Sequence, residues 1–206
     1  SYGRENESPK TFTVKLSKKS DKKITVPFRL TGAAQNDAAK EYLISTQNIE
    51  IQAGDTEGSV QASIFDNAID APNKSFTLTL GNPNNGAVLG ALKNHTYTII
   101  NNDGVPTVFF HTGQSKPREK IDGTLIIQVA LSHASGKDIN VDYTVTDKSA
   151  KNGKDFELQA GTLTFKAGTT HPESALKADI NNNNEADGNR DFIIALTTIS
   201  QGTSSL

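Results

Sequence analysis

The chain has no cysteine, no methionine and no tryptophan. The absence of cysteine excludes disulfide bonds, thiol catalysis and thiolate metal sites. No apolar run approaches the roughly 18 residues of a membrane-spanning helix, and no signal peptide is visible, so we expect no transmembrane segment. The formal net charge is only -2, which leaves no broad basic surface and predicts no nucleic-acid partner.

Catalytic patterns are also missing. The four histidines are isolated in sequence, and the H-x-E spacing of His171 and Glu173 has no cysteine to complete a zinc site. The chain contains neither a G-x-S-x-G motif nor a phosphate-binding glycine loop. Aromatic residues make up 6% of the chain, which leaves few platforms for sugars. We therefore predict that the protein is not an enzyme.

What is present is a strand pattern with period two. Hydrophobic residues make up 34% of the 206 residues, which favours thin cores between sheets that each keep one wet face. The strands predicted in the first half are Thr11–Leu16, Ile24–Leu30, Asn48–Ile51, Ser59–Ile64, Ser75–Leu80 and His95–Ile100. Those predicted in the second half are Thr107–Phe110, Thr124–Leu131, Ile139–Val145, Thr162–Phe165, Ser174–Ile180 and Phe192–Thr197. Short strands at this spacing, without an amphipathic helix, predict an all-β sandwich fold.

The two halves repeat with a period of about 115 residues, the size of one sandwich. The segment 14–30 aligns with 129–145, and Glu41-Tyr42 aligns with Asp155-Phe156. The segment "IEIQAG" at 49–54 aligns with "LTFKAG", and "SFTLTL" at 75–80 aligns with "DFIIAL". The repeat predicts two tandem domains, 1–103 and 104–206.

The ends of the two copies differ. The second copy opens with a predicted strand at 107–110, where the first has only Ser1 and Tyr2. The first copy closes with "HTYTII" at 95–100, whereas the second ends before a matching segment and is expected to lack its last strand. An unpaired edge favours strand addition from a neighbour. The plainer interpretation is a fragment of a longer repeat array.

Three motifs resemble the Calx-beta domain family. They are "KDFELQAGTLTFKAGTT" at 154–170, "FTLTLGNPNNGAVLG" at 76–90 and "YTIINNDG" at 97–104. The resemblance covers most of both copies. It implies two immunoglobulin-like sandwiches of about seven antiparallel strands each, with calcium bound at one tip by loop carboxylates.

Carried over residue by residue, the resemblance implies the following metal ligands. In the first copy they are Glu5 or Glu7, Glu41, Asp66, Asp103, and Asp70 beside the expected position; in the second copy they are Glu119, Asp155 and Asp187. Several family acids are asparagine here, including Asn67, Asn101 and Asn102. Because asparagine brings no charge, the resemblance implies a weak or degenerate calcium site, binding at about tens of micromolar or weaker. The alternative is that these residues only end strands and solvate loops.

The pattern leads to one main functional prediction and two alternatives. We expect a structural or adhesive repeat pair of a large extracellular or cell-surface protein, in contact with neighbouring repeats of the same chain. In the first alternative the chain is a calcium-sensing regulatory module, because the family includes such domains in sodium–calcium exchangers. In the second it binds carbohydrate or protein, with a cell-surface protein or glycan as partner.

Overall fold

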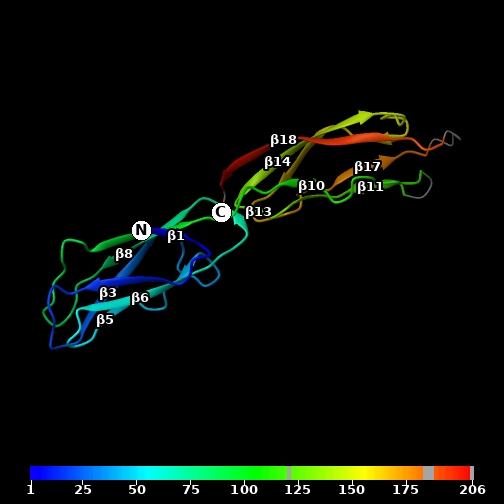
Figure 1. Cartoon of the computed structure of the whole chain (residues 1–206). Helices are drawn as coiled ribbons and strands as arrows, with labels where there is room; N and C mark the ends of the chain where they lie inside the picture. The colour runs from blue at the N-terminus through cyan, green and yellow to red at the C-terminus, as the bar shows by residue number, and fades with distance from the viewer. Residues whose placement is uncertain (120–121, 183–187, 205–206) are drawn as a thin grey trace. The chain divides into compact units, whose positions relative to one another are not determined.

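The computed structural model describes residues 1–119, 122–182 and 188–204, and every regular element in these ranges is a β-strand (Figure 1). The all-β prediction is therefore confirmed. The chain forms two compact units, one made of Ser1–Asn67 and Pro72–Asp103 and the other of Ala68–Ala71 and Gly104–Leu206. No described segment forms a helix with the length and apolarity needed to cross a membrane.

The first unit is a sandwich of two sheets around one core. Its larger sheet runs in the order β1 (Tyr2–Arg4), β9 (Asn94–Ile100), β8 (Lys74–Leu80), β3 (Ile24–Gly32) and β5 (Asn48–Ile51). Its smaller sheet runs in the order β2 (Lys10–Lys15), β6 (Glu57–Ile64) and β4 (Tyr42–Leu43). In β6 every second side chain is buried, as alternation predicts for a strand with one wet face.

The second unit has its own core and its own sheets. One sheet has the order β16 (Gly161–Phe165), β14 (Lys137–Asp147) and β18 (Phe192–Ser204), and another has β11 (Thr124–Ile127), β17 (Leu176–Ile180) and β15 (Phe156–Glu157). Two smaller pairs are β10 (Val108–Phe110) with β12 (Val129–Leu131), and β13 (Ala134–Ser135) with β7 (Ile69–Asp70). The buried residues of this unit form a cluster separate from that of the first unit.

The structure departs from the strand prediction in three ways. The first copy has an opening edge strand after all, because β1 pairs in parallel with β9 through Tyr2 and Thr98. Strands β7 and β13 also pair in parallel, so the pairing is not antiparallel throughout. The single strand predicted at Thr124–Leu131 is divided at Gln128, because β11 bonds to β17 and β12 bonds to β10.

The repeat is visible in the packing of aromatic rings. In the first unit Tyr42 stacks on Phe76, with ring centroids 3.9 Å apart and planes 14° apart. In the second unit Phe156 stacks on Phe192 at the same 3.9 Å, with planes 11° apart. Each stack joins a strand of one sheet to a strand of the other, since β4 and β8 belong to different sheets, as do β15 and β18. The equivalent residues of the two copies therefore do the same structural work.

Two smaller features repeat at equivalent positions. Gly54 and Gly168 close the "AG" turns with φ of 87° and 81°, a conformation that costs glycine little. The side chains of Asn36 and Asn152 each hold a loop by donating to a backbone oxygen and accepting from the same residue, Ile44 or Leu158. These contacts form independently in each unit.

Replacing Phe76 by alanine removes a fully buried ring from the first core, and we expect a loss of about 3–5 kcal/mol. Because the cores are separate, only the unfolding transition of the first unit shifts. Urea denaturation of the full chain, followed by circular dichroism, measures this. The control, Phe109→Ala, removes a ring that is 41% exposed and should cost less than about 1 kcal/mol. Equal shifts for both variants would contradict the assignment of the core.

Candidate metal centre

Three segments far apart in sequence meet at one end of the first unit. Glu5 follows β1, Asp66 follows β6, and Asp103 follows β9. The backbone N–H of Glu5 donates to the oxygen of Ile100 at 3.1 Å, which continues the β1–β9 pairing and fixes Glu5 beside the end of β9. The strand pairing thus gathers acidic residues that the sequence separates widely.

Glu5 is the buried member of this acidic cluster, with 4% of its surface exposed. Its Oε2 accepts from Asn67 Nδ2 at 2.6 Å, and its Oε1 accepts from the backbone N–H of Asn102 at 3.3 Å. Burial raises the pKa of the Glu5 carboxyl; the Asn102 N–H opposes this, while the charges of Asp103 and Asp66 add to the increase. Ionised Glu5 is therefore at a disadvantage in this site.

The negative charge of the cluster is incompletely matched. Among the described residues, Asp103 Oδ2 is buried and has no hydrogen-bond partner while Glu5 is ionised; a protonated Glu5 would donate to the Asp103 carboxylate, which adds to the increase in the pKa of Glu5. The Asn102 side-chain amide satisfies its neighbours only with its nitrogen facing them, where it donates to Asp66 Oδ1 at 3.2 Å and to Glu5 Oε1 at 2.9 Å. If the amide were rotated by half a turn, its oxygen would face the same two carboxylates, an arrangement that a bound cation would stabilise.

In the described ranges, no three histidine or acidic side chains already stand in an arrangement that could hold a metal ion. Instead, the side-chain amides of Asn67 and Asn102 donate hydrogen bonds to the carboxylate oxygens of Glu5. Metal binding at this cluster therefore requires the amides to turn and the carboxylates of Glu5, Asp66 and Asp103 to move closer together.

The other expected ligands of the first copy have different partners. Exposed Glu7 pairs with Lys10 Nζ at 3.0 Å, and the Lys10 hydrogen bond lowers the pKa of the Glu7 carboxyl. Burial raises the pKa of Glu41, but hydrogen bonds from Lys74 at 2.7 Å and the Gln35 N–H more than offset it, and the net pKa is lowered. Asp70 lies in β7 of the second unit, where its backbone oxygen accepts from Gly136 at 2.7 Å.

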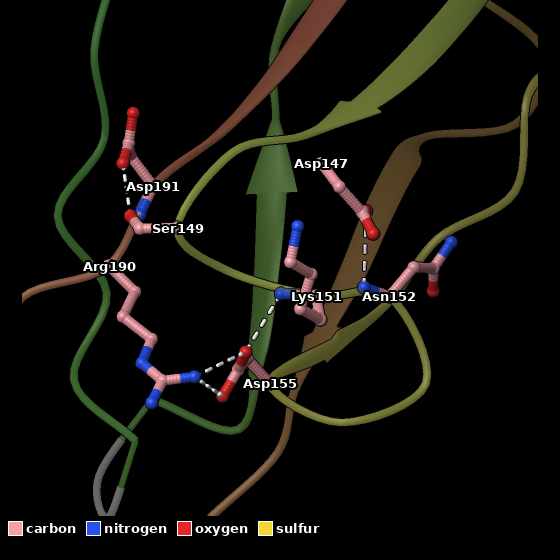
Figure 2. A network of polar contacts seen from close by, with 7 residues as sticks. All are labelled: Asp147, Ser149, Lys151, Asn152, Asp155, Arg190 and Asp191. Carbon is pink, nitrogen blue, oxygen red and sulfur yellow. Dashed lines mark hydrogen bonds and ion pairs between the residues drawn. The ribbon is translucent and has the colours of Figure 1, made fainter. Parts of the chain in front are cut away.

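In the second unit, Asp155 binds a cationic side chain. Figure 2 shows Arg190 Nη1 placed between both carboxylate oxygens, 3.1 Å from each, while the backbone N–H of Lys151 donates to Oδ2 at 2.8 Å. The Lys151 hydrogen bond and the Arg190 charge lower the pKa of Asp155 despite its burial. Asp155 is 7% exposed, so this ion pair is well shielded from water.

Polar side chains around this ion pair also have hydrogen-bond partners. Ser149 and Asp191 exchange hydrogen bonds, and Asp147 Oδ1 accepts from the backbone N–H of Asn152 at 3.2 Å (Figure 2). Of the remaining expected ligands, Glu119 lies in the turn between β10 and β11. Asp187 lies outside the described residues.

Sequence reasoning missed four participants in these sites. Asn67 and Asn102 were considered only as neutral substitutes for acids, whereas both donate to Glu5. Lys74 and Arg190 were not considered at all. A signal for them existed, because the alignment of Ser75 with Asp191 puts a basic residue at the same position in both copies.

The family model described as Calx-beta domain matches residues 2–104 and again residues 101–205. The chain belongs to the Calx-beta family. The resemblance in two tandem copies is thus confirmed.

Known proteins similar to this Calx-beta pair are an exchanger and calcium-binding domains. Sodium/calcium exchanger 2 of Rattus norvegicus is 38% identical over 72 residues, 34% of this chain and 8% of the exchanger. The chain thus spans less than a tenth of that relative. Structural neighbours include CBD12 from CALX1.2 (TM-score 0.46, 16% identity, 99% of this chain and 79% of that one). Another is the apo-form Calx CBD1 domain (TM-score 0.44, 17% identity, 50% and 89%).

The raised pKa of Glu5 predicts a pH dependence in the presence of chelator. An acid whose pKa is raised on folding stabilises the fold below its unfolded pKa, ordinarily 4.5, and this stabilisation is lost as the pH rises through the folded pKa. We expect the first unit to lose stability as the pH rises above about 4.5, and Glu5→Gln to remove this loss. Urea denaturation across that range measures it.

Glu7→Gln is the matched control for the pH prediction. The pKa of Glu7 is lowered in the folded state, so its contribution has the opposite sign and is lost only as the pH falls. Parallel loss of stability with rising pH in the wild type and in Glu5→Gln would contradict the role given to Glu5.

Proposed function

We propose that this Calx-beta pair is a calcium-sensing regulatory module and that its first unit binds the ion. The observation that carries the proposal is the buried carboxylate of Glu5 beside Asp66 and Asp103, with one oxygen of Asp103 buried and unpartnered among the described residues. Such an arrangement is costly without a cation, because buried charges require compensation.

The residues of the cluster fit the chemistry of calcium. Calcium takes six to eight hard oxygen ligands from carboxylates, amide carbonyls, backbone carbonyls and water. Glu5, Asp66 and Asp103 would supply the negative charge, and the turned amides of Asn67 and Asn102 would supply neutral oxygens. Because two of the five side chains are neutral, we propose an affinity on the order of tens of micromolar.

Calcium at this cluster would act where the chain leaves the first unit. The chain passes into the second unit at Asn67–Ala68 and again at Asp103–Gly104, so cluster residues flank both passages. Relief of repulsion among the acids would order both segments together, and binding to the folded form alone would raise stability. This coupling of ion binding to backbone order is what a sensor requires.

The comparisons support the regulatory interpretation over the adhesive one. The relative matched in sequence is a sodium/calcium exchanger, 38% identical over 72 residues. Since the matched segment is 8% of the exchanger, ion exchange itself is not part of the proposal.

A second candidate is the structural or adhesive repeat of an extracellular or cell-surface protein. The observation that favours it is the Arg190–Asp155 ion pair, which holds the second unit with a side-chain cation and suits a spacer that works without metal. Removal of the protein from intact cells by an added protease would support this location. Full protection on intact cells would oppose it.

Calcium titration of the full chain by calorimetry tests the regulatory proposal. We expect saturable binding and a midpoint of thermal unfolding that is higher in calcium than in chelator. Asp103→Asn should weaken binding by about tenfold or more, because it removes one of three charges. Glu57→Gln removes an exposed acid paired with Lys15 and should leave binding unchanged. Equal midpoints in calcium and in chelator would sink the proposal.

A further inference from the structure

In each unit one ion pair joins the two sheets of the sandwich. In the first unit, Lys74 Nζ of β8 lies 2.7 Å from Glu41 Oε1, just before β4 in the opposite sheet. In the second unit, Arg190 before β18 reaches Asp155 before β15, again across the two sheets (Figure 2).

The two ion pairs occupy equivalent positions of the repeat. Each acid directly precedes the first ring of a stack, Tyr42 or Phe156. Each base stands two residues before the second ring of the same stack, Phe76 or Phe192. The residue types differ between the copies, because one pair is lysine with glutamate and the other is arginine with aspartate. The positions of the base and of the acid in the repeat are the same. A shared geometry with different side chains indicates that the charge pairing itself is what matters.

These two pairs are also shielded more than the other ion pairs of the described residues. The side chains are 27% and 19% exposed in Lys74–Glu41, and 24% and 6% in Arg190–Asp155. By contrast, the side chains of the surface pair Lys166–Asp138 are 53% and 31% exposed. Exposed pairs contribute little to stability, whereas a shielded charge that loses its partner is costly.

We propose that Lys74 and Arg190 are built-in cations that clamp the two sheets of each unit without metal. In the second unit the arginine takes the place of calcium, so that ion binding is confined to the first unit. The statement about calcium rests on the proposed function, whereas the clamp does not.

The contacts of Asp155 explain why the second unit does not fit calcium. Arg190 Nη1 contacts both carboxylate oxygens, and the Lys151 N–H donates to one of them. A metal ion would have to displace a guanidinium whose Nη1 already contacts both carboxylate oxygens, and the repulsion between the two cations would add to that cost.

Arg190→Met in the full chain, with chelator present, tests the clamp. Hydrogen exchange read by mass spectrometry should show amides across 190–196 exchanging about tenfold faster or more, because the inter-sheet contact is lost. Lys166→Met, the matched control in the same unit, should leave exchange there unchanged. Combination with Asp155→Asn should give less than the sum of the two single effects. Additive effects, or equal effects of Arg190→Met and Lys166→Met, would overturn the clamp.

Lys74→Met separates this inference from the proposed function. We expect faster exchange across 74–80 in chelator, together with calcium binding tighter by about threefold or more, because a nearby positive charge is removed. Faster exchange with no calcium heat in any variant would leave the clamp standing and reject the calcium proposal. Unchanged exchange would overturn the clamp in the first unit whatever calcium does. A new second calcium site in Arg190→Met, absent from the wild type, would support the substitution of arginine for metal.

Discussion

In each unit, two aromatic rings stack between the sheets of the sandwich, and this contact determines where the nearby charged side chains lie. The rings pair as Tyr42 with Phe76 and as Phe156 with Phe192, at the same centroid distance. In each stack one ring directly follows an acid, and the other follows a base by two residues. Stacking of the rings therefore also brings the acid and the base together. Apolar packing thus sets the positions, and electrostatics then stabilises them.

The acidic cluster of the first unit is held by a different constraint. Backbone pairing of β1 with β9 fixes Glu5 beside the end of β9, and the side-chain amide of Asn67 and the backbone N–H of Asn102 then donate to its carboxylate. Hydrogen bonds from neutral amides satisfy geometry but supply no positive charge. The acidic cluster is therefore held in place by hydrogen bonds, but these bring no positive charge to it. In the second unit, by contrast, Arg190 supplies a positive charge to Asp155.

Much of the fold followed from the alternation of side chains, and much of the site did not. Strands with several alternating residues, such as β3, β6 and β14, were predicted to within a few residues, because one buried face imposes a period of two. The short strands β1, β4, β7, β13 and β15 were missed, since two or three residues show little alternation, although the three-residue β10 was predicted as Thr107–Phe110. Of the expected ligands, Glu5, Asp66 and Asp103 come together, whereas Glu7 and Glu41 pair with lysines.

The sequence by itself determined the all-β class, the two copies and the family. Alternating side chains and repeated motifs involve residues close together in the sequence, so they can be recognised without a structure. Only the tertiary structure decided which acids meet and which are neutralised. The partners of Glu41 and Asp155 lie more than thirty residues away, at 33 and 35 positions respectively. Such contacts depend on which strands face one another across the two sheets, and the alternation of side chains along one strand does not specify which strands those are.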